Sequence, residues 1–251
     1  MRQAMIFAAG LGTRLRPLTD TMPKALVRVG EKPLLDHVLD RLEASGFERV
    51  VINVHHFADQ IIDYVGCHPR PCMDIRFSDE REALLETGGG LRKAASLFSS
   101  DSHVLIHNVD IISNVDLGEF YSHAADADAT LLVSERQTSR YLLFDDGMMM
   151  KGWTHIGTGE VRSPYPSLDP SLYRKLAFAG IHVISPRLLQ MMESWPERFG
   201  IIDFYLSQCD KTRIKGYLKT DLRLMDVGKL DTLEKAAEFI RQLSTPSETM
   251  S

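Results

Sequence analysis

Residues 8–24 read Ala-Ala-Gly-Leu-Gly-Thr-Arg-Leu-Arg-Pro-Leu-Thr-Asp-Thr-Met-Pro-Lys, and they begin at the end of the apolar run Gln3–Ala9. That run predicts a short buried strand. Open α/β sheets bind ligands outside the carboxyl ends of their strands, which is where this loop begins. Gly10 and Gly12 allow a phosphate group to approach the loop backbone closely. The stretch therefore predicts an α/β fold with a phosphate-binding loop after its first strand.

Three cations share this loop: Arg14, Arg16 and Lys24. Like charges in one loop repel each other unless an anion is bound, so their clustering favours phosphate binding. Two common phosphate motifs are absent. Leu15 stands where G-x-G-x-x-G requires its last glycine, and no G-x-x-x-x-G-K-[S/T] run occurs. On the glycines alone, a surface turn with solvated arginines explains the loop equally well.

Strand and helix patterns alternate through the rest of the first half. Apolar runs predict strands, and apolar residues repeated every three or four positions predict helices. Strands that alternate with helices indicate a parallel sheet covered by helices on both faces. The predicted helices are 34–44, 58–65 and 87–97, and the predicted strands are 50–54, 74–77 and 103–108.

The second half has a different pattern. Residues 141–153 predict a hairpin with its turn at 145–147. Strands are predicted at 129–133 and 177–183, and helices at 186–195 and 229–243. No internal repeat or low-complexity linker separates the halves. We therefore expect a single domain over 1–243, followed by a polar and flexible tail at 244–251.

Two aspartates lie at the ends of predicted elements in distant parts of the chain. Asp110 lies just beyond the predicted strand 103–108, and Asp226 precedes the predicted helix 229–243. Mg²⁺ prefers hard oxygen ligands, commonly one or two carboxylates together with substrate phosphates and water. Each aspartate also has an ordinary interpretation, because Asp226 could cap the helix and Asp110 could hold a turn.

Composition excludes several classes of protein. The 251 residues carry a formal net charge of −5, which disfavours a nucleic-acid-binding coat. The three cysteines contain no C-x-x-C pair, so neither a disulfide framework nor a zinc knuckle is expected. We find no signal-peptide pattern and no apolar stretch long enough to span a bilayer, so a cytoplasmic enzyme without a membrane partner is the expectation.

Residues 8–24 resemble the signature of the sugar-1-phosphate nucleotidyltransferases, in which the same glycine–arginine loop is followed by Pro-Lys. Asn108-Val-Asp110 and Asp226-Val-Gly228 are similar to the two metal motifs of that family. The resemblance implies a Rossmann-like three-layer α/β/α nucleotidyltransferase fold with a mixed, mainly parallel central sheet. It implies Mg²⁺ as cofactor, a nucleotide-binding half at 1–110 and a sugar-binding half at 111–243.

The resemblance also implies a role for individual residues. An NTP and a sugar 1-phosphate would be the substrates, and catalysis would rest on positioning and charge. The nucleotide is expected to contact Ala9, Gly10, Gly12, Thr13, Arg14, Lys24 and Gly88, and the sugar is expected to contact Glu86, Asn108 and Gly180. The expected catalytic residues are Arg14, Lys24, Asp110 and Asp226, with Mg²⁺ held by Asp110 and Asp226.

Three positions depart from the family pattern. Leu84 stands where some members have a base-reading glutamine, Val109 replaces a common glycine, and Leu224 replaces a common tryptophan. No metal ligand is lost. The resemblance therefore does not specify the shape of the sugar pocket or the choice of nucleobase.

Compact N-acetylmuramate-1-phosphate uridylyltransferases resemble this chain most, so UTP is the expected nucleotide. Mannose- or heptose-1-phosphate guanylyltransferases remain open alternatives. A catalytically silent sugar-nucleotide sensor of the same fold is a third, which the retained Arg14, Lys24 and both aspartates disfavour. A dinucleotide-dependent oxidoreductase is disfavoured by Leu15.

Overall fold

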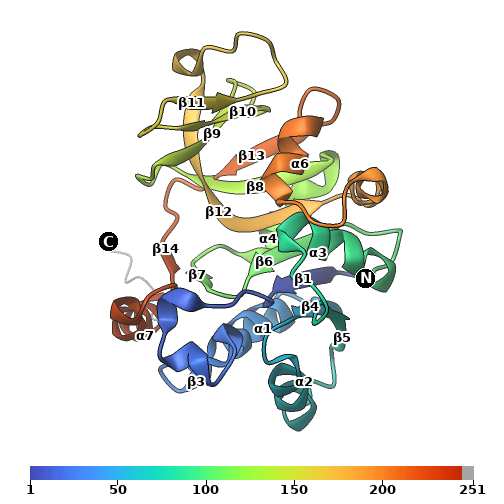
Figure 1. Cartoon of the computed structure of the whole chain (residues 1–251), viewed down its shortest axis with the longest axis vertical. Helices are drawn as coiled ribbons and strands as arrows, with labels where there is room; N and C mark the ends of the chain where they lie inside the picture. Colours follow the sequence, from blue (N-terminus) through green and yellow to red (C-terminus); the bar gives the residue numbers. More distant parts are fainter. Residues whose placement is uncertain (245–251) are drawn as a thin grey trace, which may run out of the picture.

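The computed structural model describes residues 1–244. One mixed sheet runs through both halves of the chain (Figure 1). The expected tail 244–251 lies outside the described residues apart from Ser244, which ends the last helix. The division into halves at residue 110 stays a prediction.

Four parallel strands form the sheet of the first half. β1 (Gln3–Phe7) lies between β4 (Arg49–Val54) and β6 (Val104–Asn108), and β5 (Asp74–Asp79) pairs with the outer edge of β4. Parallel strands that are buried on both faces read as continuous apolar runs, which is why the sequence predicted them. A strand was predicted at 3–9, but β1 ends two residues earlier, at Phe7. The Ala8 and Ala9 amides donate to the side chain of Asn53 instead of to a neighbouring strand.

Helices cover both faces of this sheet, as the three-layer prediction required. α1 (Leu34–Ala44) and α2 (Ala58–Cys67) pack in the apolar core that contains Ile6, and α3 (Glu86–Ala94) packs in the core that contains Met5. Ile6 and Met5 are adjacent on β1, so they point to opposite faces of the sheet. Each helix presents its apolar stripe to one of these faces.

The second half joins the sheet through one long antiparallel strand. β12 (Arg174–Ile184) pairs with β6 through its second half and with β9 (Arg140–Phe144) through its first. On its other side it pairs with β8 (Ala129–Ser134), which is parallel to β13 (Ile214–Leu218). β9, β10 (Met150–His155) and β11 (Glu160–Arg162) lie at the opposite end of the molecule from α2 (Figure 1). From β5 to β13, four of the six strand pairs are parallel, so the central part of the sheet is mixed and mainly parallel, as predicted.

Several elements were absent from the sequence prediction. α6 (Ile201–Gln208) is apolar nearly all round, so it lacks the one-sided period of a surface helix. β7 (Ile111–Ser113) and β14 (Leu224–Asp226) pair with each other but are too short to show alternation. Also not predicted are α4 (Leu117–His123), β2 (Arg28–Val29) and β3 (Lys32–Pro33). By contrast, α5 (Pro186–Gln190) and α7 (Leu230–Ser244) correspond to the predicted helices 186–195 and 229–243.

Short 3₁₀ turns complete the fold. The predicted helices 87–97 and 186–195 each end in one, so their last turns are tighter than α-helix. The turns occupy Thr13–Leu15, Leu18–Asp20, Lys24–Leu26, Ala95–Leu97, Ala124–Asp126, Pro170–Leu172 and Met191–Ser194.

Candidate active site

A cleft of about 460 Å³ opens beyond the carboxyl ends of β1 and β6. It brings together most of the residues that the sequence singled out. The lining consists of residues 7–14, Lys24, Asn53, Glu80, Leu84, Glu86, Thr87, residues 108–110 and Gly228. Two predicted glycines, Gly88 and Gly180, and the carboxylate residue Asp226 are outside this lining.

The two loop glycines are present for different reasons. Gly12 has φ +63°, and a Cβ atom there would lie 2.9 Å from Cγ2 of Thr19. The Thr19 hydroxyl donates to the Gly12 carbonyl at 2.9 Å, so the turn itself requires glycine at this position. A Cβ atom at Gly10 would meet nothing within 4 Å. Gly10 therefore leaves open space in the cleft, which suits close approach by a ligand.

Two cations of the loop face the two aspartates. Lys24, which is 8% exposed, forms an ion pair with Asp110 inside the cleft. A Cβ atom at Gly228 would lie 2.9 Å from an Nη atom of Arg14 and 2.8 Å from Oδ1 of Asp226. Gly228 thus leaves room for the Arg14 guanidinium beside Asp226. Arg16 is paired with Asp20 at 3.2 Å on the exposed side of the loop and does not line the cleft.

The β7–β14 ladder explains how two aspartates from distant segments meet. Asp226 is paired across the ladder with Ile111, and the Val227 amide donates to the Asp110 carbonyl at 2.9 Å. Within residues 1–244 no group of three or more histidines, cysteines or acids gathers to hold a metal. Mg²⁺ accepts one or two protein carboxylates when phosphates and water complete its shell, so Asp110 and Asp226 fit such a substrate-dependent site.

A buried hydrogen-bond network, missed by the sequence analysis, lies beside the start of the glycine–arginine loop at the cleft. Oδ1 of Asn53 accepts from the Ala8 and Ala9 amides at 2.7 and 3.3 Å, and its Nδ2 donates to Glu80 at 2.7 Å. The second Glu80 oxygen accepts from the Leu85 amide at 3.2 Å. Burial raises the pKa of Glu80 above its ordinary value, although these donors oppose the shift. The network joins the phosphate loop to the segment that enters α3.

The start of α3 divides into residues inside and outside the cleft. Glu86 and Thr87 line it, and Glu86 forms an ion pair with Arg198 at 3.0 Å. The Gly88 amide donates to the Phe199 carbonyl at 2.9 Å, and a Cβ atom at Gly88 would overlap the Phe199 ring. The structure therefore assigns Gly88 a packing role against the segment before α6, and its expected nucleotide contact stays a prediction.

Asn108 and Gly180, which were both expected to contact the sugar, are in contact with each other. Gly180 has φ +76°, and a Cβ atom there would lie 2.8 Å from Nδ2 of Asn108. The glycine therefore makes room for the Asn108 side chain at the edge of the cleft. Leu84 also lines the cleft, so an apolar side chain occupies the position at which some family members have a base-reading glutamine.

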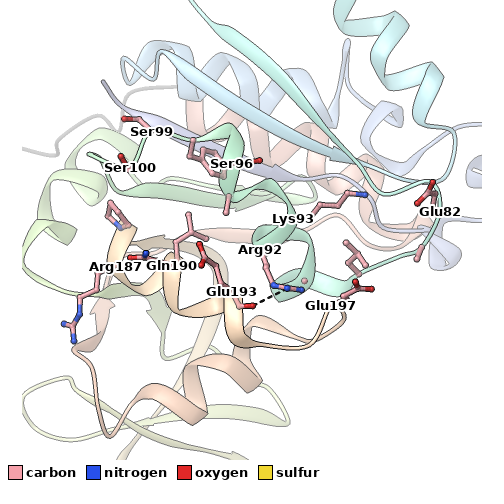
Figure 2. Close-up of a pocket in the computed structure, with 17 residues that line it drawn as sticks. Glu82, Arg92, Lys93, Ser96, Ser99, Ser100, Arg187, Gln190, Glu193 and Glu197 are labelled. Atoms are coloured by element: carbon pink, nitrogen blue, oxygen red, sulfur yellow. Dashed lines mark hydrogen bonds between the residues drawn. The ribbon is translucent and has the colours of Figure 1, made fainter.

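A larger cavity, of about 850 Å³, is lined by residues of α3 and α5 and of the segments 82–85 and 95–100 (Figure 2). Its cations are already engaged: Arg92 donates to the Glu193 carbonyl at 3.3 Å, and Arg187 lies 3.2 Å from Asp128. No residue of the glycine–arginine loop and neither aspartate of the ladder lines it. The smaller cleft, which gathers the phosphate loop and Asp110, is therefore the candidate active site.

No helix in the described part of the chain is long and apolar enough to cross a membrane. The fold matches that of solved structures. HddC from Yersinia pseudotuberculosis superimposes with a TM-score of 0.75 at 22% identity, covering 96% of this chain and all of that one.

Sequence relatives agree with the geometry. The chain is 37% identical over 199 residues to an N-acetylmuramate α-1-phosphate uridylyltransferase of Caulobacter vibrioides, covering 74% of this chain and 76% of that protein. It is 29% identical to a mannose-1-phosphate guanyltransferase of Emericella nidulans, covering 77% of this chain and 52% of that protein. Residues 3–242 match the family model described as nucleotidyl transferase. The chain therefore belongs to the nucleotidyl transferase family, and the resemblance inferred from its loop and aspartates is confirmed.

Proposed function

We propose that this protein transfers UMP from UTP to N-acetylmuramate 1-phosphate and releases pyrophosphate, with Mg²⁺ as cofactor. The observation that carries the proposal is the meeting of Lys24 and Arg14 with Asp110 and Asp226 at one cleft edge. Opposed cations and carboxylates suit a metal–triphosphate complex, because the cations contact phosphate oxygens while the carboxylates hold the metal.

The reaction needs no strong base from the protein. The second pKa of a phosphate monoester is about 6, so a sugar 1-phosphate is largely dianionic near neutral pH. One of its oxygens attacks the α-phosphorus in line, and the bond to pyrophosphate breaks. The chain then has to align the two substrates and stabilise the developing charge. The cleft lining contains no histidine or cysteine, which agrees with that requirement.

Individual residues would divide this work. Arg14 would contact the triphosphate, and Lys24 would move from Asp110 to a phosphate oxygen when the nucleotide enters. Asp110 and Asp226 would hold Mg²⁺, which when bound supplies positive charge to the phosphate oxygens. Asn108 would face the sugar next to Gly180. An enzyme with these substrates would act in the cytoplasm.

The nucleotide and sugar are the finer part of the proposal. The uridylyltransferase relative supports UTP and N-acetylmuramate 1-phosphate, because the similarity extends over three quarters of each chain. Guanylyl transfer to mannose 1-phosphate is the second candidate, supported by a relative of which the chain spans about half the length. In either case backbone groups of residues 8–10 would contribute to reading the base, since Leu84 offers no polar handle.

A pyrophosphate-release assay tests the proposal. Each of the four NTPs is paired with N-acetylmuramate 1-phosphate and with mannose 1-phosphate, and kcat/KM is measured for each pair. The expected result is a preference for UTP with N-acetylmuramate 1-phosphate. A preference for GTP with mannose 1-phosphate would overturn the uridylyl assignment. Failure of every pair, combined with measurable binding of a sugar nucleotide, would instead support the silent sensor.

A further inference from the structure

A small cavity of about 240 Å³ lies at the sheet edge beside the proposed sugar site. Its walls are residues 134–136, 219–220, 222 and 224. β8 and β13 run parallel to each other, and both are related to β6 through the antiparallel β12, so all three strands end at the same edge. β8 is two strands from β6, a separation of about 10 Å at ~4.8 Å per step. Ser134 pairs with Ala177, three residues along β12 from the Gly180 that contacts Asn108, and Leu224 in the cavity wall is two residues from Asp226, so the cavity adjoins the proposed sugar site.

Arg136 is fixed at the mouth of this cavity. One of its Nη atoms donates to the Phe178 carbonyl at 3.0 Å, and Phe178 lies two residues before Gly180 on β12. No other hydrogen bond or ion pair of this guanidinium is made within residues 1–244. Because a guanidinium carries five N–H donors in a fork that matches a carboxylate, Arg136 is held in place with donors to spare.

A second cation, Lys219, comes from the end of β13. It donates to Asp221 at 2.7 Å, and the Asp221 side chain is 74% exposed. Exposed ion pairs of this kind contribute little to stability, so a ligand anion can share or replace this partner. The carboxylate in the cavity wall, Glu135, lies 3.5 Å from Arg174 and is countered there.

Ser134, in the cavity wall, carries a buried hydroxyl. The residue is 7% exposed, and its Oγ has no hydrogen-bond partner in the described part of the chain and less than 1 Å² of accessible surface. A buried hydroxyl without a partner is unfavourable, and rotation of this side chain toward the cavity would let a ligand oxygen relieve the cost. Two cations and an unsatisfied hydroxyl in one small cavity thus point to a small anionic group.

We propose that Ser134, Arg136 and Lys219 form a subsite for a carboxylate substituent of the sugar 1-phosphate. The inference rests on the proposed function, since N-acetylmuramate 1-phosphate carries a lactyl carboxylate where N-acetylglucosamine 1-phosphate carries a hydroxyl. It makes this subsite the determinant that selects the acidic sugar over neutral ones. A site built to bond a charged group rejects an analogue that lacks it, because its own groups are then left unpaired.

The test compares these two sugar phosphates with UTP in the wild type and in Arg136→Ala. The wild type should prefer N-acetylmuramate 1-phosphate. Arg136→Ala should lower its kcat/KM by about ten- to a hundredfold, the range for a hydrogen bond to a charged group, and should change kcat/KM for N-acetylglucosamine 1-phosphate by less than about threefold. Arg213→Ala is the matched control, because Arg213 is an exposed arginine beside the opposite end of β13.

Ser134→Ala provides a second variant with a different signature. Removal of an unpaired hydroxyl should leave the melting temperature of the free enzyme unchanged or higher, while the preference for N-acetylmuramate 1-phosphate falls. Equal losses of activity with both sugars in Arg136→Ala, or no sugar preference in the wild type, would overturn the subsite and leave uridylyl transfer standing.

Binding separates failure of the subsite from failure of the proposed reaction. Thermal shift is measured with each sugar phosphate in the absence of turnover. If no pair reacts, a larger stabilisation by N-acetylmuramate 1-phosphate that disappears in Arg136→Ala still supports the subsite. Equal stabilisation by the two sugar phosphates would contradict it.

Discussion

Residues 1–110 and residues 111–243, the proposed nucleotide and sugar halves, differ in how their buried polar groups are paired. In the nucleotide half, Asn53, Glu80 and Lys24 are buried at the cleft, and each has a hydrogen-bond or ion-pair partner. Seven buried side-chain atoms lack a partner within residues 1–244, and five of them lie in the sugar half. Those five are Thr130 Oγ1, Ser134 Oγ, Tyr205 Oη and both ring nitrogens of His182.

This difference indicates that paired and unpaired buried polar groups have different effects. Satisfied networks hold a loop in one geometry, so the phosphate side of the cleft is organised before a ligand arrives. Unsatisfied groups reduce stability and make it dependent on pH or on a ligand that completes them. We therefore expect substitutions in the nucleotide half to damage catalysis first, and substitutions of unpaired groups in the sugar half to alter stability or substrate choice.

The largest effect is expected at the β7–β14 ladder, where the halves meet. Asp110→Ala and Asp226→Ala should each lower kcat by about a thousandfold or more, because a metal ligand supports several kcal/mol of charge stabilisation. EDTA should abolish activity, and added Mg²⁺ should restore it. Asp126→Ala is the control, since Asp126 is an exposed acid paired with Lys215. Near-wild-type turnover in either cleft variant, with melting unchanged, would remove that residue from the metal site.

The next effect concerns two arginines of one loop. Arg14 lies against Gly228, two residues from Asp226, whereas Arg16 is exposed and paired with Asp20. Arg14→Ala should lower kcat/KM by about a hundredfold, as loss of a group that stabilises developing charge commonly does. Arg16→Ala should change it by less than about threefold, because exposed ion pairs contribute little. Steady-state kinetics of both variants measure this difference in kcat/KM. Similar small losses in the two variants would mean that the loop is a solvated turn without a role in charge stabilisation.

The sequence predicted the nucleotide half well because its signals are local. Continuous apolar runs marked β1, β4 and β6, and α1 was predicted with the bounds that the structure has. Asp110 and Asp226 could be predicted as candidates because each follows or precedes a recognisable element. Their meeting was implied only by the family resemblance, since β7 and β14 contain three residues each and pair only in the folded chain.

The Asn53–Glu80 network was missed for a related reason. Asn53 is a polar residue inside the apolar run Val50–Val54, and this interruption is the signal that could have identified it. A single buried amide has no periodicity, and its partners Ala8, Ala9 and Glu80 come from two other segments. Only the parallel order of β1, β4 and β5 brings them together.

A third prediction tests whether this network serves binding or only stability. Asn53→Ala leaves the Ala8 amide and one Glu80 oxygen without their partner, so the free energy of unfolding should fall by about 2 kcal/mol. The loop would also lose its fixed geometry, so KM for the NTP should rise about tenfold while kcat changes less. Urea unfolding and steady-state kinetics measure the two effects.

Gln3→Ala is the matched control for that variant. Gln3 is a buried amide at the opposite end of β1, where it bonds Ser99 and the Ser102 carbonyl. It should lose comparable stability without a change in KM for the NTP. Similar KM values in the two variants would show that Asn53 acts through stability alone.

The smallest effect is expected from His182, in the core of the sugar half. Burial lowers the pKa of His182 to about 3, and the ring lies between Phe178 and Tyr205 without a hydrogen-bond partner in the described chain. The unfolded state binds a proton below pH 6.5 while the folded state does not, so stability is lost as pH falls from 6.5 toward 3. At pH 5 this loss is about 2 kcal/mol, from 1.5 pH units at about 1.36 kcal/mol each.

His182→Phe should remove that share of the pH dependence. Phenylalanine fits an apolar site and has no unpaired nitrogen, so the variant should be as stable as wild type or more stable at pH 7.5. Between pH 7.5 and pH 5.0, the free energy of unfolding measured in urea should then fall by about 2 kcal/mol less in the variant than in wild type. His107, whose pKa burial also lowers to about 3, remains in both proteins, so some pH dependence should persist. Identical losses in the two proteins would mean that His182 is protonated in the folded state, and the proposed contrast between the halves would not extend to this core.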